Sequence, residues 1–327
     1  TLYIETVDPS PFKLLIVDEA QDLTPLQWAM VQKMAAAAEE VLIAGDDDQA
    51  IHRWTGVQIE IFINMSPHKI VLEQSYRLPK KIFDVGQRIV KRIKNRVPKD
   101  YHPTDEDGQV IWHYEMHSVP LDNNSTTIMA RTNYLVKELA AQVHELGYYY
   151  SVNGNPPIST DVARAIQTWR DLQGGEAVHI SRIRELYERV PKQGDKAVIK
   201  RGSAKLLDAA DPEALLNIKN LIDEFGLIAP DRSAFDALNL GSKLQSFLHH
   251  VERRGEDITK PPRIKLSTIH RMKGGEDDVC VVYLGTTKMC YENPYQDDEH
   301  RAFYVAVTRA RKVLHLVESD KRFKYII

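Results

Sequence analysis

The stretch LLIVDEAQD, which spans Leu14–Asp22, contains the features that decide the fold of this chain. Its first four residues form a continuous apolar run, which predicts a buried β-strand. The run ends at two adjacent carboxylates, Asp18 and Glu19. In an open parallel sheet, ligands bind beyond the carboxyl ends of the strands, where such a pair suits a metal ion and a polarised water. Taken alone, the pair is also compatible with a solvated acidic turn.

The residues that follow predict a βαβ unit. Thr24 suits an N-cap, Pro25 suits the first helical position, and Gln27 completes a capping box. A second apolar run, Val41–Ala44, predicts another buried strand, which ends in the polar segment Gly45–Gln49. The intervening helix should bury its apolar residues in the core. These are Leu26, Ala29, Met30, Met34 and Ala37.

Alternating strands and helices are predicted over most of the remaining chain. The apolar runs that predict strands are Ile70–Leu72, Val110–Trp112, Thr127–Ala130, Tyr148–Val152, Arg263–Ser267, Val279–Leu284 and Val313–Val317. Helices are predicted with a buried side between Ile82 and Ile93, from Leu135 to Leu146, and around residues 298–311. A different region lies between, with helical segments predicted at 160–173, 180–189, 212–225 and 241–253.

Composition is that of an ordinary globular protein, with 43% hydrophobic and 27% charged residues. No apolar run approaches the roughly 20 residues of a membrane span. The two cysteines, Cys280 and Cys290, fit no disulfide or metal framework, which predicts a reducing, intracellular setting. Because the net charge is -3, nucleic-acid binding would depend on a local patch and not on the total charge.

Two features favour contact with nucleic acid, and each has an ordinary alternative. Trp54, beside His52 and Arg53, could stack on a base, although an isolated Trp more often lies in a core or a domain interface. The helix that contains Ile82 carries a basic side, which is either solvated or faces phosphates. The basic residues are Lys80, Lys81, Arg88, Lys91, Arg92 and Lys94.

Five spaced motifs resemble those of superfamily 1 DNA helicases of the UvrD/Rep/PcrA type. DEAQD at Asp18–Asp22 is similar to the Walker B motif of that family. GDDDQAIHRW at Gly45–Trp54 and LEQSYR at Leu72–Arg77 resemble its third and fourth motifs. STIHRMKGGE at Ser267–Glu276 and YVAVTRA at Tyr304–Ala310 resemble its fifth and sixth motifs. The five follow the order of the family over nearly the whole chain.

The resemblance implies an α/β fold with two RecA-like parallel sheets, one truncated and one complete, and a mostly helical inserted subdomain. Residues 1–66 would be the C-terminal part of the first motor domain (1A), 67–159 and 260–327 the second (2A), and 160–259 a 2B-like insertion. The sequence starts at Thr1 and contains no G-x-x-x-x-G-K-[ST] phosphate loop (Walker A). We therefore expect the C-terminal part of a helicase, which by itself hydrolyses ATP weakly or not at all.

The same resemblance implies ATP and Mg²⁺ as cofactors and assigns catalytic roles. Asp18 would hold Mg²⁺, and Glu19 would polarise the attacking water. Gln49 would sense the γ-phosphate and couple it to DNA. Arg77 and Arg309 would reach the transferring phosphoryl group as arginine fingers, which is the charge neutralisation that phosphoryl transfer requires.

Binding roles are implied as well. Gly275 and Glu276 would contact the nucleotide, with Glu276 at the ribose, together with Gln49, Arg77 and Arg309. The residues that would contact DNA are Trp54, His52, His270, Arg131 and Asn133. For Arg131 and Asn133, an ordinary surface role remains an equal alternative.

The implied function is ATP-dependent movement on single-stranded DNA, in the 3′-to-5′ direction, with unwinding of duplexes. Single-stranded DNA and its junctions with duplex DNA would be the substrates, and accessory repair or replication proteins would be partners, with no membrane contact. The expected location is the cytoplasm of a bacterial or phage-infected cell, at the nucleoid. Two alternatives remain: a non-catalytic DNA-binding or scaffold module that keeps the fold, and an RNA helicase of the same superfamily.

Overall fold

The computed structural model describes residues 8–66, 68–122 and 125–327, which form an α/β structure. The chain divides into two compact units, one formed by residues 1–139 and 265–327 and the other by residues 140–264. Residues 1–7, which belong to the predicted 1A part, lie outside the described residues. The predicted division into 1A, 2A and 2B-like parts stays a prediction.

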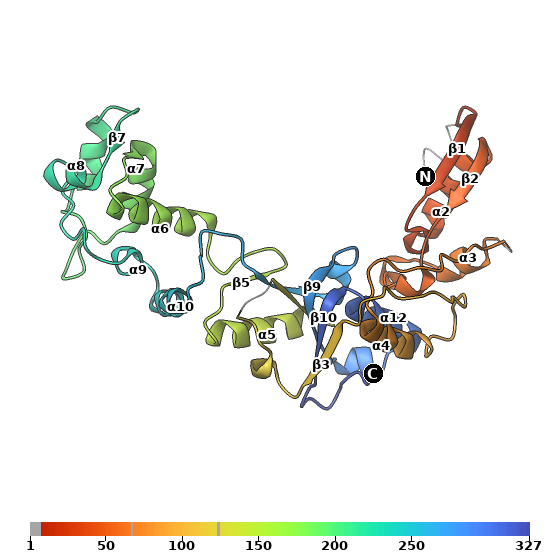
Figure 1. Ribbon diagram of the computed structural model, residues 1–327. Helices are drawn as coiled ribbons and strands as arrows, with labels where there is room; N and C mark the ends of the chain where they lie inside the picture. Colours follow the sequence, from red (N-terminus) through yellow and green to blue (C-terminus); the bar gives the residue numbers. More distant parts are fainter. Residues whose placement is uncertain (1–7, 67, 123–124) are drawn as a thin grey trace. The chain divides into compact units, whose positions relative to one another are not determined.

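A two-stranded parallel sheet forms the N-terminal part of the first unit. Strands β1 (Phe12–Val17) and β2 (Ala38–Ile43) pair in parallel, and helix α2 (Pro25–Ala35) connects them and packs on both (Figure 1). The predicted capping box is confirmed, because the side chains of Thr24 and Gln27 each accept from the other residue's backbone N–H. The predicted βαβ unit is therefore present.

The burial predicted for this unit is wrong in detail. In β1 only Leu15 is buried, and β2 has no fully buried residue. On α2 the buried residues are Trp28 and Val31. The predicted core residues are exposed (Leu26 and Met30) or half-buried (Ala29, Met34 and Ala37). The physical reason is that alternate side chains of a strand point to opposite faces, so Leu15 can reach the cluster around α2 while its neighbours face away from it.

A six-stranded sheet forms the larger part of the fold, with the strand order β3-β10-β9-β4-β8-β5. Its strands are β3 (Gln109–His113), β4 (Thr126–Ala130), β5 (Tyr150–Val152), β8 (Ile264–Thr268), β9 (Asp277–Tyr283) and β10 (Ala310–Val317). Strand β10 pairs in parallel with β3 and β9, and β9 pairs in parallel with β4. The predicted strands in these six places are confirmed. Strands β4 and β9 are buried almost throughout, as expected of central strands in a covered parallel sheet.

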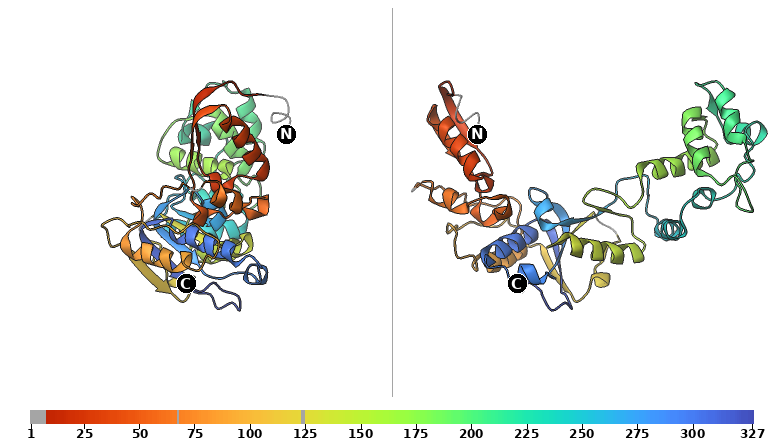
Figure 2. Two further views of the ribbon diagram at one scale, coloured as in Figure 1. Left: turned by 90° about the vertical axis from the view of Figure 1, so that its right-hand side faces the viewer. Right: turned by 180° about the vertical axis from the view of Figure 1, so that it is seen from behind.

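Helices α4 (Lys80–Val90) and α12 (Gln296–Val307) lie side by side and share the main hydrophobic core with β9 and β10 (Figures 1 and 2). The helix predicted at 298–311 is too long, since α12 ends at Val307 and β10 begins at Ala310. Thr308 is the C-cap of the helix, and its hydroxyl donates to the carbonyl of Tyr304. The basic side chains on and just after α4 are exposed, and their phosphate-facing role stays a prediction.

The strand predicted at Ile70–Leu72 is wrong. These residues have no strand structure, and Ile70 is 95% exposed. A short apolar run becomes a strand only when a neighbouring strand pairs with it, and here pairing is limited to a single bridge between Gln74 and His102.

Shorter elements complete the first unit. They are α3 (Ile59–Asn64), α5 (Asn133–Glu145, which runs past residue 139), α11 (Lys288–Tyr291) and the 3₁₀ turns η1 (Ala20–Asp22), η2 (Asp47–Gln49), η3 (Arg53–Thr55), η4 (Met116–Ser118) and η6 (Ile269–Met272). The turns η1 and η2 begin a few residues after the two strands of the smaller sheet and carry motif residues.

The unit formed by residues 140–264 is mostly helical, as predicted. Helices α6 (Thr160–Gln173), α7 (Ile180–Arg189) and α10 (Ser242–Arg253) confirm three of the predicted helices. The helix predicted at 212–225 is too long, because Asn217 and Asn220 form a capping box that starts a short helix only at residue 218, and this helix ends at residue 223. The remaining elements are β6 (Val178–His179), η5 (Ser203–Ala209), β7 (Leu215–Leu216), α8 (Ile218–Asp223) and α9 (Ala234–Ala237), with β6 and β7 antiparallel.

Cys280 and Cys290 are buried free cysteines. Over the ranges that the structure describes, no helix combines the length and the apolar character needed to cross a membrane.

Candidate functional site

The carboxylate pair lies at the tip of β1, directly after Val17. Asp18 and Glu19 are both exposed, and the Glu19 N–H donates to Asp18 Oδ1 at 2.8 Å. Glu19 has left-handed backbone angles, with φ 51° and ψ 35°, which cost a non-glycine residue about 1–2 kcal/mol. A hydrogen bond offsets part of this cost, because Nε2 of the buried Gln21 donates to Glu19 Oε2 at 2.5 Å. The backbone therefore sets the direction of the Glu19 side chain.

Gln21 also joins the tips of the two strands. Its Oε1 accepts from the Asp46 N–H at 2.9 Å, so one amide bridges the segment after β1 and the segment after β2. The approach is possible because residue 45 is glycine, since a Cβ there would lie 2.4 Å from Gln21 Oε1 and 2.9 Å from a ring carbon of Phe62. The sequence analysis gave Gln21 no role, although it lies inside the DEAQD motif.

Lys273, from the segment between η6 and β9, connects the fifth motif to these strand tips. Its ammonium pairs with Asp22, lies 3.7 Å from Glu19 Oε2, and donates to the Gln49 carbonyl at 2.9 Å. The side chain of Lys273 is almost fully buried. It too was missed as a functional candidate, and its position in the KGGE end of the fifth motif is the signal that could have identified it.

Gln49 and Arg309, from the third and sixth motifs, are brought into direct contact. Arg309 Nη2 donates to Gln49 Oε1 at 3.0 Å, and Gln49 Nε2 donates to Asp46 Oδ2 at 2.7 Å. Arg309 is only 1% exposed, and its Nε donates to the Val305 carbonyl at 3.0 Å. Burial, reinforced by the nearby charge of Arg77, lowers the pKa of Arg309 to about 10. The guanidinium is still charged at neutral pH but lies in a costly environment.

Arg77 and Glu276 face one another beside this pair. Arg77 Nη1 lies 3.7 Å from Glu276 Oε2, while Arg77 Nε is buried and has no hydrogen-bond partner among the described residues. Glu276 Oε1 also pairs with Arg311 Nη1 at 3.1 Å. The Gly275 carbonyl accepts from Arg309 Nη1 at 3.3 Å, which links the predicted nucleotide contacts to the arginines.

An open pocket of about 690 Å³ lies at these residues. It is lined by Ser75, Tyr76, Arg77, Thr104, Glu106, Glu276, Asp278, Arg311 and Lys312. Tyr76 is another residue that the sequence analysis missed; it is exposed at the pocket and directly precedes Arg77. The unpartnered Nε–H of Arg77, the guanidinium groups of Arg77 and Arg311, and the exposed ring of Tyr76 suit a polyphosphate attached to a base. The residues present therefore fit a nucleotide.

A metal ion has fewer candidate ligands. In residues 8–66, 68–122 and 125–327, no group of three His, Cys, Asp or Glu side chains is placed to hold one. Mg²⁺ is commonly bound by one or two carboxylates together with phosphate oxygens and water. The exposed Asp18 carboxylate fits that mode of binding.

The predicted DNA-contacting residues fall into two sets. His52 forms edge contacts with Trp54 and His270, at ring-centroid distances of 6.4 Å and 6.1 Å, and Trp54 is 77% exposed. Burial lowers the pKa of His52, and burial together with the charge of Arg131 lowers the pKa of His270 to about 4. Both imidazoles are therefore neutral at pH 7 and present rings and hydrogen-bonding groups rather than positive charge.

The second set is less available for DNA. The Arg131 guanidinium makes two hydrogen bonds of 2.7 Å to the buried carboxylate of Glu299, so its charge is already paired. Asn133 is exposed at the first turn of α5. The two sets are linked electrostatically, because the charge of Arg131 contributes to the lowered pKa of His270.

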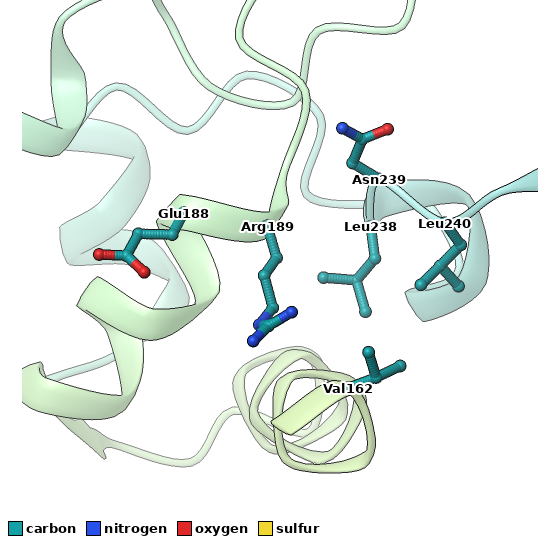
Figure 3. A pocket seen from close by; sticks show the side chains of 6 residues that line it. All are labelled: Val162, Glu188, Arg189, Leu238, Asn239 and Leu240. Atoms are coloured by element: carbon teal, nitrogen blue, oxygen red, sulfur yellow. The ribbon is translucent and has the colours of Figure 1, made fainter. Parts of the chain in front are cut away.

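A smaller pocket of about 180 Å³ lies in the unit formed by residues 140–264 (Figure 3). It is lined by Val162, Glu188, Arg189, Leu238, Asn239 and Leu240. None of the predicted site residues borders it. The Arg189 side chain pairs with Asp161 at 3.4 Å, so this pocket offers no isolated positive charge.

Two family models match the chain. Residues 9–69 match the UvrD/REP helicase N-terminal domain, and residues 157–321 match the UvrD-like helicase C-terminal domain. The fold, with its parallel sheets and its motifs at the strand tips, is that of a RecA-like helicase core. The chain belongs to the UvrD/PcrA-type superfamily 1 helicases.

The relatives that match the chain are named as DNA helicases. The chain is 21% identical over 412 residues to the ATP-dependent DNA helicase PcrA of Bacillus subtilis, covering 95% of this chain and 55% of the relative. It is 28% identical over 144 residues to a probable DNA helicase II homolog of Mycoplasma capricolum, covering 42% of this chain and 19% of the relative. It is 30% identical over 109 residues to PcrA of Staphylococcus aureus, covering 32% and 15%. The chain thus spans about half the length, or less, of the relatives it matches.

Proposed function

We propose that this chain is part of an ATP-dependent DNA helicase or translocase that moves 3′ to 5′ on single-stranded DNA and unwinds duplexes. The observation that carries the proposal is the 3.0 Å hydrogen bond from Arg309 to Gln49, which joins residues 260 positions apart in the sequence. A residue that senses the γ-phosphate and an arginine that neutralises it must meet at the same phosphate. Lys273 ties the same point to Glu19, the proposed base.

Arg77 and Arg309 are suited to hold a transferring phosphoryl group. Their mutual repulsion and the unpartnered N–H of Arg77 are unfavourable, and an anion between the two side chains would relieve both. Because the groups are already positioned, little reorganisation would accompany the reaction. Glu276 would turn from its arginine partners to the ribose hydroxyls, and Gly275 would line the same edge.

Asp18 and Glu19 would perform different tasks at the tip of β1. A Mg²⁺ ion held by Asp18 would supply charge neutralisation at the phosphates. Glu19 would accept a proton from the attacking water, with its carboxylate directed by Gln21. The strained backbone of Glu19 and the amide that restrains it support this assignment.

Two of the proposed DNA contacts, His52 and Trp54, lie a few residues beyond Gln49 in the sequence. Trp54 would stack on a base, with His52 and His270 behind it, because an exposed indole supported by neutral rings is a stacking platform. Arg131 and Asn133 would contact the DNA backbone, which for Arg131 requires that Glu299 share its guanidinium. Movement of Gln49 on phosphate release would then be transmitted along η2 and η3 to the stacked base.

Substrates and setting follow from the same proposal. We expect single-stranded DNA and its junctions with duplex DNA as substrates, and accessory repair or replication proteins as partners. A cytoplasmic, nucleoid-associated location fits such substrates.

The test is DNA-stimulated ATP hydrolysis by the full natural gene product and by residues 1–327. We expect Arg309→Ala to lower turnover by about 10³-fold or more in the gene product, the scale of an arginine finger, while Arg201→Ala in the other unit has no effect. Unchanged turnover in Arg309→Ala would refute the proposal. Residues 1–327 should hydrolyse ATP weakly or not at all, because they contain no phosphate loop.

A second candidate is a non-catalytic DNA-binding or scaffold module. The absence of a phosphate loop from the 327 residues favours it. Retention of the Gln49–Arg309 contact speaks against it, since DNA binding alone needs no phosphate sensor. Tight binding of single-stranded DNA by the natural gene product, without any ATP hydrolysis, would favour this candidate.

A further inference from the structure

Three successive aspartates, Asp46, Asp47 and Asp48, follow β2, and two of them are buried almost completely. Buried carboxylates are costly unless cations and hydrogen-bond donors compensate them. The cations that do so here come from the segment between α4 and β3, about fifty positions further along the chain. None of these cations belongs to the five helicase motifs, so the proposed mechanism leaves them without a role.

Arg96 and Lys99 provide the compensation. Arg96 makes a bidentate contact with Asp48, through Nε to Oδ1 at 2.8 Å and Nη2 to Oδ2 at 2.7 Å. The Lys99 ammonium contacts all three carboxylates, at 3.1 Å from Asp46 Oδ1, 2.9 Å from Asp48 Oδ2, and in a shorter contact with Asp47. Burial disfavours the charge of Lys99, but the three carboxylates outweigh this effect, and the pKa of Lys99 is raised.

This cluster is connected to the proposed phosphate sensor through Asp46. One carboxylate oxygen of Asp46, Oδ1, lies 3.1 Å from Lys99 Nζ, and the other, Oδ2, accepts from Gln49 Nε2 at 2.7 Å. With its Nε2 on Asp46, the Gln49 amide can direct only its Oε1 toward Arg309 Nη2, at 3.0 Å. A flipped amide would place two donors against each other at Arg309 and leave Asp46 without a donor from Gln49.

From this geometry we infer that Lys99 and Arg96 are positioning residues for the Gln49–Arg309 pair. Lys99 fixes the Asp46 carboxylate, which fixes the orientation of the Gln49 amide, and Arg96 holds Asp48 so that η2 keeps its place. The inference rests on the proposed function in one respect: Gln49 and Arg309 are the groups that meet the γ-phosphate. The chain of contacts itself is independent of whether ATP is hydrolysed.

A purely structural role for Lys99 is the alternative. It would lower the stability of the whole unit and would leave the Gln49 amide as ordered as the rest of the fold. The distinguishing observable is therefore the side-chain amide of Gln49, whose two Nε2 protons should exchange slowly with solvent while Asp46 holds one of them. A second distinguishing observation is rescue by arginine, which keeps the charge at position 99.

The experiment uses isotope-labelled residues 1–327 and follows the Gln49 amide by NMR, assigned with Gln49→Glu. We expect Lys99→Met to accelerate exchange of the Gln49 Nε2 protons at least tenfold and Lys99→Arg to restore most of the protection. The matched control is Lys321→Met, which removes a lysine–carboxylate pair with Glu138 away from the Asp46–Asp48 cluster and should leave the Gln49 amide unchanged. If Lys99→Met does not fold, Lys99→Gln provides the same comparison with a donor but no charge.

Protection of Gln49 within twofold of the unmodified chain in Lys99→Met, or in Lys99→Gln where that variant is used, would overturn the inference. Equal acceleration by the Lys99 and Lys321 variants would also overturn it, because this would indicate general loosening. Binding of a fluorescent ATP analogue with Mg²⁺, measured in parallel, should weaken in Lys99→Met and recover in Lys99→Arg. Failure of the unmodified chain to bind the analogue would count against nucleotide binding by this chain, while the exchange result would still decide the positioning role.

Discussion

The two-stranded sheet and the six-stranded sheet both end in motif residues, but their strands differ in burial. Strands β4 and β9 are buried almost throughout, whereas β1 has one buried residue and β2 has none. The difference shows that similar apolar runs reach different environments. Burial of a run depends on what packs against its two faces, and this is not encoded in the run itself.

The comparison also shows how the smaller sheet is held in place within the first unit. The segments that follow β1 and β2 contact the part of the unit that contains the larger sheet, and these contacts are largely polar. They include Lys273 on Asp22, Arg96 on Asp48, and Arg301 Nε on the Asp47 carbonyl at 2.9 Å. Ile51 is the residue from this region that joins the main hydrophobic core. Under the proposed function such a joint would be useful, because polar contacts can be exchanged for contacts with a nucleotide without loss of either core.

The largest expected effect comes from removing core volume in the larger sheet's layer. Phe303 on α12 is fully buried and stacks on Tyr325 at a ring-centroid distance of 4.0 Å. Phe303→Ala should therefore lower the free energy of unfolding by about 3–5 kcal/mol, measured by urea denaturation. The matched change in the smaller sheet is Ile16→Ala, at an exposed position of β1, which should alter it by less than about 0.5 kcal/mol. A cost above about 2 kcal/mol at Ile16 would show that something covers this face in solution.

Much of the larger sheet could be predicted from the sequence, because its central strands are buried on both faces and read as continuous apolar runs. The run Val279–Leu284 is an example that the structure confirms as part of β9. The run Ile70–Leu72 looked similar but forms no strand, since no neighbouring strand pairs with it. The capping box at Thr24 was predictable because it is local, whereas the buried face of α2 depends on partners outside the helix.

Those residues of the candidate site that belong to a recognisable motif could be predicted from the sequence. The contact between Gln49 and Arg309 agrees with the roles that the resemblance implies, although those roles stay proposals. Lys273, Gln21 and Lys99 were missed, because each acts through contacts with residues that a local pattern does not specify. Lys99, for example, lies in a segment that reads as a loop, and only the fold brings it to Asp46.

A second prediction concerns Trp54, the exposed tryptophan in the part of the chain that follows the smaller sheet. Trp54→Ala should weaken binding of a single-stranded oligonucleotide by about 1–3 kcal/mol, the contribution of one base stacked on an aromatic ring. Because Trp54 is exposed, the free energy of unfolding should change little. Fluorescence anisotropy of a labelled oligothymidine measures the affinity.

The larger sheet offers the matched control for this substitution. Trp112 on strand β3, at the edge of the sheet, is also exposed, so Trp112→Ala removes the same side chain from the other region. It should leave DNA affinity unchanged. Equal losses for the two variants would contradict a specific stacking role for Trp54, and would indicate that any exposed tryptophan of this chain contributes to binding.

The smallest expected effect concerns the stability of the chain at acid pH, which should depend on a titrating histidine in the larger sheet. His315 on β10 is buried, and its Nδ1 lies 2.8 Å from His113 Nε2. Burial, with a further contribution from His113, lowers the pKa of His315 to about 4 from an ordinary value of 6.5. Between these two values the unfolded chain binds a proton that the folded chain does not, so stability falls as the pH falls and is fully present above about pH 6.5. From pH 6.5 to 5.5 the loss of stability from this residue should be about 1 kcal/mol.

His315→Gln should flatten that part of the curve of stability against pH, measured by urea denaturation at each pH. Above pH 7 the curves of the variant and of the unmodified chain should run parallel. An unchanged slope between pH 6.5 and 5.5 in this variant would mean that the acid sensitivity arises elsewhere, for instance at His270, whose pKa is also lowered to about 4.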